Sequence, residues 1–152
     1  MSIKRALLST AAVFGFAAGL ATAAVAEEIT IATVNNADMI TMQELAPEWE
    51  KATGNSINWV VLEENVLRQR TTQDIATNGG SFDIMFIGAY ETPIWGDNGW
   101  LTSLNDFADD ADYDLNDIFQ LVRNGLSANG NLYAVPLYSE TSFTFYRTDV
   151  FE

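Results

Sequence analysis

The stretch that decides the fold is ITIATVNNADMITMQELAPEWEKATGNSINWVVL, residues 29–62. It begins and ends with short apolar, β-branched runs at 29–34 and 57–62, which favour strands. Between them, residues 39–53 repeat apolar side chains at the three- and four-residue spacing of one helix face: Met42, Leu45, Ala46 and Trp49. The stretch therefore predicts a strand, a helix ended by Gly54 and a second strand.

Proline interrupts the first predicted helix. Pro47 lies inside the pattern and removes one backbone hydrogen bond. We therefore expect a kink there, or a helix that begins later than the pattern suggests.

The same alternation continues along the chain. A polar loop at 63–65 precedes a second helix at 66–77, which lacks a clean apolar stripe. Residues 82–87 (FDIMFI) are nearly continuous in apolar side chains, as in strands covered on both faces. A short helix follows, with Thr92 as its N-cap and Pro93 at its first position, and it ends near residue 99.

Strands that alternate with helices indicate an α/β fold with a mainly parallel sheet flanked by helices and right-handed crossovers. Ligands of such sheets lie at the carboxyl ends of the strands. Three polar loops occupy those ends here, at 35–38, 63–65 and 88–91. These three loops are therefore expected to carry ligand-binding residues.

The first two loops offer hydrogen-bonding side chains. Asn36 and Asp38 suit hydroxyl groups, but either residue type also caps helices and stabilises turns, and Asp38 is a candidate N-cap of the first helix. Glu63 and Glu64 are adjacent at a strand end and point in opposite directions, which disfavours a shared acid–base role. One glutamate, Glu63, is a candidate acceptor for hydroxyl groups of a ligand, and at least one of the two is solvated surface charge.

The third loop combines aromatic and acidic side chains. Tyr90, Glu91 and Trp95 follow the third strand, and an aromatic plane against the C–H face of a sugar, with polar groups at its edge, is a common way to bind one. The alternative for Trp95 is packing in the core. Trp100 and Leu101 are expected in the core.

The chain closes on GNLYAVPLYSETSFTFYRTDVFE, residues 130–152. A short apolar run at 133–136 follows a turn at 129–131, and the run 143–146 is rich in residues that strands favour. Thr148 or Asp149 could cap a helix, but the sequence stops two residues into it. We therefore expect the chain to be the first part of a longer protein.

This closing block resembles family 1 of the extracellular solute-binding proteins of ABC importers. The opening EITIATVNNADM, residues 28–39, is most similar to the polyol (sorbitol/mannitol) branch. The residues that match the family pattern are Gly130, Leu132, Tyr133, Val135, Pro136, Tyr138, Glu140, Tyr146, Arg147, Asp149 and Phe151.

The resemblance implies a periplasmic-binding-protein-like fold, of which residues 27–152 form an incomplete N-terminal lobe that ends at the crossover towards lobe two. It implies a small neutral polyol or sugar as ligand and ABC permease subunits as partners, with no cofactor and a monomer at full length. In the family the position of Glu140 lies near the cleft between lobes, so Tyr138 and Glu140 join the candidate ligand-binding residues.

Residues 1–26 have the layout of a secretory signal peptide. Lys4 and Arg5 precede an uncharged run at 6–26, which ends in the small-residue cleavage pattern 24–26. A transmembrane anchor is the alternative. The sequence has no Cys, so it offers no lipid attachment at the cleavage point, no disulfides and no thiolate metal site. We expect export to the periplasm.

Charge and composition limit the function. Without residues 1–26 the chain keeps 5 of its 7 basic and all 21 acidic residues, a formal net charge of −16. Such a polyanion repels nucleic acids and anionic lipid and disfavours an anionic ligand. The acidic segment 109–117 fails as a calcium loop, because Leu115 and Leu121 stand where Gly and Glu are needed. We expect Asn116 or Asp117 to cap a following helix.

An enzyme has little support in the sequence. It contains no His or Cys, no G-x-S-x-G elbow and no phosphate-binding G-x-x-x-x-G-K, and it does not reveal the facing carboxylates of a glycosidase. Two alternatives to the binding protein stay open: an exported fragment that binds nothing, and a fragment of a carbohydrate-active enzyme.

Overall fold

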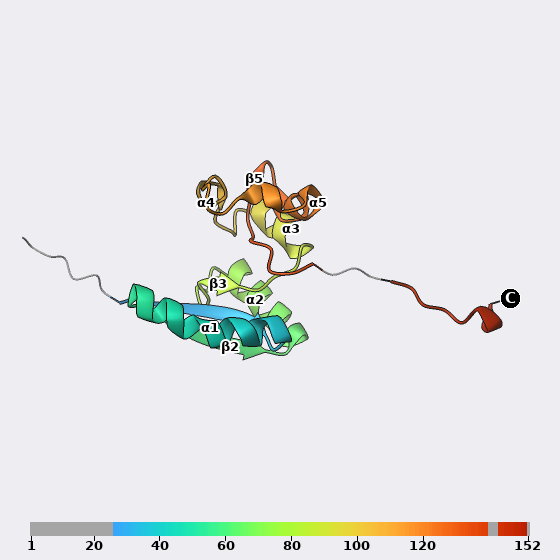
Figure 1. The fold of residues 1–152 in the computed structure, drawn as a ribbon, viewed down its shortest axis with the longest axis horizontal. Coiled ribbons are helices and arrows are strands. Elements are labelled where there is room, and N and C mark those ends of the chain that lie inside the picture. The colour runs from blue at the N-terminus through green and yellow to red at the C-terminus, as the bar shows by residue number, and fades with distance from the viewer. Residues whose placement is uncertain (1–25, 140–142, 152) are drawn as a thin grey trace, which may run out of the picture.

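A three-stranded parallel sheet is the centre of the structure, a computed structural model that describes residues 26–139 and 143–151 (Figure 1). Its strands are β1 (Glu28–Val34), β2 (Ser56–Leu62) and β3 (Ile84–Met85), in the order β2-β1-β3. β1 and β2 pair over their whole length, with Ile29 opposite Ile57 and Val34 opposite Leu62. The predicted parallel α/β arrangement is confirmed.

Two helices cover the sheet, α1 (Ala37–Thr53) between β1 and β2, and α2 (Glu64–Ala76) between β2 and β3. Because β1 is central, right-handed crossovers place the two helices on opposite faces. Burial agrees: Ala32 and Thr33 are neighbours in β1, point to opposite faces, and both have 0% exposure. The core therefore sits near the carboxyl end of the central strand.

Both helices begin two residues earlier than predicted, because side chains in the preceding loops cap them. Asn36 accepts a hydrogen bond from the Met39 amide and is the N-cap of α1, so the expectation that Asp38 caps this helix is wrong. α1 continues without a break across Pro47, and a later start is wrong as well. Gly54 ends it in the left-handed conformation that favours glycine, as predicted.

The apolar face predicted for α1 is only partly covered. Ala46 is buried, and so is Met39 one turn into the helix, but Met42, Leu45 and Trp49 are 42%, 52% and 38% exposed. Within residues 26–139 and 143–151, no element packs over this side of α1 enough to bury it.

The third strand is shorter than the predicted 82–87, because a side chain replaces part of its backbone pairing. The Asp83 carboxylate accepts from the Thr30 amide at 2.8 Å. Backbone bonds from Asp83 to Thr30 and from Phe86 to Ala32 still hold the flanking residues beside β1, at 3.0 and 2.8 Å.

The chain then builds a second, smaller group of elements above the sheet in Figure 1: α3 (Glu91–Asp97), α4 (Asn105–Ala108), the 3-10 turn η1 (Leu115–Asp117), α5 (Gln120–Gly125) and the antiparallel pair β4 (Ser127–Ala128) and β5 (Asn131–Leu132). The predicted turn joins β4 to β5, with φ of 50° at Asn129 and 80° at Gly130. Positive φ at both central positions matches the right-handed strand twist.

Three expectations for this group are wrong. Tyr90 takes the N-cap position of α3, because Thr92 lies inside the helix, where its hydroxyl donates to the Gly88 carbonyl. Phe119 holds the N-cap position of α5, because Asn116 instead accepts from Arg123. Trp100 is 41% exposed rather than in the core.

An aromatic contact supports α4. The rings of Phe107 and Tyr113 lie 4.3 Å apart, and burial raises the pKa of the Tyr113 hydroxyl. The acidic segment that contains Tyr113 is thus anchored by this ring.

Residues 143–151 run away from the body (Figure 1). The run 143–146 forms no strand, because the described residues provide no neighbouring strand for it to pair with. The predicted cap at Thr148 or Asp149 is also wrong: 148–150 form the 3-10 turn η2, preceded by Arg147. Arg147 bonds the Asp149 carboxylate, which lowers the pKa of Asp149 and raises that of Arg147.

Across the two described ranges, none of the helices combines the length and the apolar character needed to cross a membrane.

Candidate functional site

A cleft opens where the three parallel strands end. Their carboxyl ends share one edge of the sheet, and the chain beyond them leads into α1, α2 and α3. The cleft has a volume of about 2280 Å³ and is lined from one side by these strand ends and from the other by α3, α5 and residues 133–139. Figure 1 shows the two groups of elements that face each other across it. This is where the sequence predicts a ligand.

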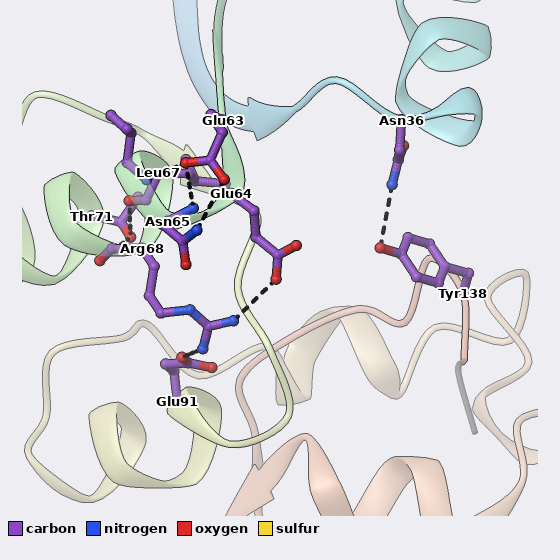
Figure 2. A network of polar contacts seen from close by, with 10 residues as sticks. Asn36, Glu63, Glu64, Asn65, Leu67, Arg68, Thr71, Glu91 and Tyr138 are labelled. Carbon is purple, nitrogen blue, oxygen red and sulfur yellow. Dashed lines mark hydrogen bonds and ion pairs between the residues drawn. The ribbon is translucent and has the colours of Figure 1, made fainter. Parts of the chain in front are cut away.

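Asn36 lies at the edge of the cleft and uses both ends of its side-chain amide. The oxygen caps α1, and the nitrogen donates to the Tyr138 hydroxyl at 3.2 Å (Figure 2). The two residues are 102 positions apart in the sequence. The ligand and cap interpretations of Asn36 are therefore compatible, because the cap uses only the oxygen.

Tyr138 also contacts the third strand end through its ring. The ring centroids of Tyr138 and Phe86 lie 5.8 Å apart and are tilted by 31°. Tyr138 is 39% exposed, so part of this aromatic surface faces the cleft, where a sugar or polyol could pack against it.

Glu63 ends the loop after β2 and caps α2. Its carboxylate accepts from the amides of Asn65 and Val66 at 3.0 and 3.2 Å and from the Asn65 side chain at 3.0 Å. Capping satisfies amides that the helix leaves unbonded. Glu64 is exposed and forms an ion pair with Arg68 at 3.3 Å, one helical turn on, as expected for one glutamate of this pair.

Among the described acidic residues of the cleft wall, Glu91 is the most enclosed. It begins α3, and its residue exposure is only 9%. Its Oε1 forms an ion pair with Nη1 of Arg68, which lies on α2 (Figure 2). The pair joins two elements on either side of the cleft.

The other candidates lie in different surroundings. Trp95 lines the cleft but is 4% exposed, which agrees with the core alternative weighed from the sequence. Tyr90 is 77% exposed, and Asp38 is exposed in the first turn of α1. Neither belongs to the cleft wall. Glu140 lies outside the described residues.

Arg68 and Phe86 are the site residues that sequence reasoning missed. The sequence predicts Phe86 inside the third strand, but β3 ends at Met85, so Phe86 lies in the loop that follows. Arg68 lies four residues after Glu64, the spacing of a helical ion pair. The sequence could have indicated Arg68, because it pairs with Glu64 in a helix that has no apolar stripe to dictate which side faces the core.

The charge of the cleft favours neutral or cationic ligands. Among the described residues of its wall, Arg68 is the one basic side chain, against five carboxylates. No cluster of His, Cys, Asp and Glu in residues 26–139 and 143–151 is arranged to hold a metal ion. The wall can thus offer carboxylate and amide groups with aromatic surface, a combination that suits hydroxylated molecules.

The model of the bacterial extracellular solute-binding protein family matches residues 33–152. The chain belongs to this family. The family suggested by the closing block of the sequence is therefore confirmed.

Relatives of this chain bind sugar alcohols. It is 54% identical over 128 residues to the mannitol-binding protein of Pseudomonas aeruginosa, a match that covers 84% of this chain and 29% of the relative. This chain thus spans less than a third of the length of that curated relative.

Solved structures agree with both fold and family. An ABC transporter solute-binding protein from Agrobacterium vitis S4, with bound D-mannitol, matches with a TM-score of 0.71 and 54% identity over 73% of this chain and 27% of that one. A solute-binding protein from Agrobacterium radiobacter K84 in complex with ribitol matches with a TM-score of 0.65 and 25% identity, over 72% and 28%. The periplasmic-binding-protein-like fold class is confirmed.

Proposed function

We propose that this chain is the N-terminal part of the substrate-binding component of an ABC importer for a sugar alcohol or sugar. In this proposal residues 27–152 form most of one lobe, and the ligand lies in the cleft at the strand ends. A second lobe closes over it by hinge motion. The protein binds its ligand and performs no chemistry, so it needs no cofactor.

The observation that carries the proposal is the 54% identity to two binding proteins, one named for mannitol and one solved with D-mannitol bound. The wall of the cleft supports the same ligand class. Asn36, Glu63, Glu91, Trp95 and Tyr138 all lie along it, and an excess of carboxylates disfavours anions. We assign ligand contacts to these five, and we also propose them for Asp38, Tyr90 and Glu140.

The location and partners follow from the same proposal. A leader at 1–26 directs the chain to the periplasm and is removed after Ala26, and the absence of Cys leaves the product without a lipid anchor. The monomeric protein then delivers its ligand to permease subunits in the membrane. It binds no nucleic acid, because its net charge is strongly negative.

Calorimetry on the intact protein tests this function. We expect D-mannitol or another six-carbon sugar alcohol to bind with a dissociation constant in the micromolar range or below, about −8 kcal/mol or stronger. Mannitol 1-phosphate is the matched anionic control and should bind at least tenfold more weakly. Tight binding of the phosphate, with no binding of any neutral polyol or sugar, would contradict the proposal.

A further inference from the structure

One carboxylate oxygen of Glu91 has no hydrogen-bond donor among the described residues. Oε1 is held by Arg68, but Oε2 is shielded from solvent and receives no hydrogen bond from any residue within 26–139 or 143–151. Leaving a buried acceptor without a donor costs about 1–3 kcal/mol, and more when it is charged. We therefore expect that Oε2 receives a hydrogen bond from a donor in the functioning protein.

Arg68 carries donors to spare at the same place. Its guanidinium has five N–H groups, and described residues use one on Nη1 for Glu91 and one on Nη2 for Glu64. The side chain is 53% exposed in the cleft. The buried carboxylate oxygen and the unused guanidinium donors thus lie next to each other.

Gly88 leaves the room that this carboxylate occupies. A Cβ at position 88 would lie 2.7 Å from Oε2 of Glu91, closer than real Cβ contacts come. The φ of Gly88 is not in the left-handed region, so the backbone would accept alanine. Glycine at position 88 is therefore needed to leave room for the Glu91 carboxylate, and not for the conformation of the turn.

We propose that Arg68 and Glu91 form a subsite that binds two neighbouring hydroxyl groups of the ligand, a vicinal diol. Arg68 donates to one hydroxyl oxygen, and Oε2 of Glu91 accepts the hydrogen of the next. The inference rests on the proposed function and deepens it. Hydrogen bonds to charged groups are stronger than neutral ones, so this subsite contributes to affinity as well as orientation.

The ion pair explains how the subsite is prepared. Oε1 bonded to Arg68 fixes the plane of the carboxylate before the ligand arrives (Figure 2). Binding then orders little, which keeps its entropic cost low. The chemistry favours a neutral diol over an anion, because an anion would meet the Glu91 carboxylate.

Glu91→Gln in the intact protein tests the acceptor, with Glu64→Gln as the matched control. Both substitutions remove one carboxylate partner of Arg68, but only Glu91 offers a buried oxygen. We expect D-mannitol affinity, measured by calorimetry, to fall at least tenfold for Glu91→Gln and less than threefold for Glu64→Gln. Melting temperatures without ligand report separately on the structural part of each ion pair.

Gly88→Ala tests the geometry without a change of charge. Its methyl group should displace Oε2 and weaken D-mannitol binding at least tenfold. Gly125→Ala is the control, because a Cβ there lies at an ordinary 3.7 Å from the Ala89 Cβ, and its affinity should stay within threefold.

The outcomes separate this inference from the function it rests on. If the unsubstituted protein binds no polyol or sugar, both are overturned. A different result would overturn the subsite alone. In that case the unsubstituted protein binds D-mannitol, and Glu91→Gln and Gly88→Ala bind it equally well but have lower melting temperatures. The ion pair would then be structural. A crystal structure with D-mannitol should place a ligand hydroxyl about 2.5–3.0 Å from Oε2, and a water in that position would count against it.

Discussion

Asn36 shows how one side chain can serve both the fold and the site. Its amide oxygen satisfies the Met39 amide at the start of α1, and its amide nitrogen reaches Tyr138. A helix cap is therefore also the link between the first strand end and the far wall of the cleft. Stability and ligand binding at this position have to be measured separately.

Asn36→Ala and Asn36→Ser separate the two tasks in the intact protein. Serine caps helices about as well as asparagine, whereas alanine costs about 1 kcal/mol. We expect urea unfolding to show that loss for Asn36→Ala only. Polyol affinity should fall for both variants, because both lose the amide nitrogen. A serine variant as unstable as the alanine variant would show that the cap is not the source of the loss.

Glu140 is the candidate that the family pattern favours most, although it lies outside the described residues. A carboxylate can accept two hydroxyl hydrogen bonds, each stronger than a neutral one. Glu140→Ala in the intact protein should weaken polyol binding at least tenfold, about 1.4 kcal/mol. Calorimetry checks this, and unchanged affinity would remove Glu140 from the site.

Periodicity predicted the first two strands well and the starts of the helices poorly. The runs 29–34 and 57–62 are found within one residue of β1 and β2, since β-branched residues form strands wherever a partner is available. The cap of α1 was assigned to Asp38 as readily as to Asn36, because the choice depends on backbone angles that composition does not set. For the same reason, the sequence predicts Thr92 as the N-cap of α3, although Thr92 lies inside that helix.

The packing of α3 against Tyr133, the residue after β5, gives a test of these elements. A Cβ on Gly96 would lie 2.5 Å from the Tyr133 ring, so alanine must push the ring away. Overpacking costs about 1–3 kcal/mol, more than the gain of up to about 1 kcal/mol from helix propensity. We expect Gly96→Ala to lower the free energy of unfolding of the intact protein.

Gly125→Ala is the control for Gly96→Ala, because it changes the same residue type in a helix without a close contact. It should be neutral or stabilising in urea unfolding. Equal losses for the two variants would show that the Tyr133 contact is not responsible.

The cleft as a whole could be placed from sequence, but not its most specific contact. Parallel strands bring their carboxyl ends to one edge, so the three polar loops were expected to meet. The Arg68–Glu91 ion pair joins residues 23 positions apart on α2 and α3, and it depends on how α3 sits against the sheet. No local pattern encodes that packing.

The cleft is also larger than a small ligand requires. Ligand pockets usually measure about 300–1,000 Å³, against about 2280 Å³ here. Phe119 and Leu121 on its wall are 83% and 85% exposed. In the proposed full-length protein, further chain covers this apolar surface and reduces the cleft to the size of its ligand.

Residues 27–152 produced alone should therefore behave unlike the intact protein. Exposed apolar surface binds the dye ANS and favours aggregation. We expect the isolated segment to give strong ANS fluorescence and no tight polyol binding, and the intact protein to give weak fluorescence and tight binding. Phe119→Ser with Leu121→Ser should reduce the signal of the segment, because both side chains belong to that surface. A compact, monomeric segment without ANS binding would mean that these elements need no covering chain.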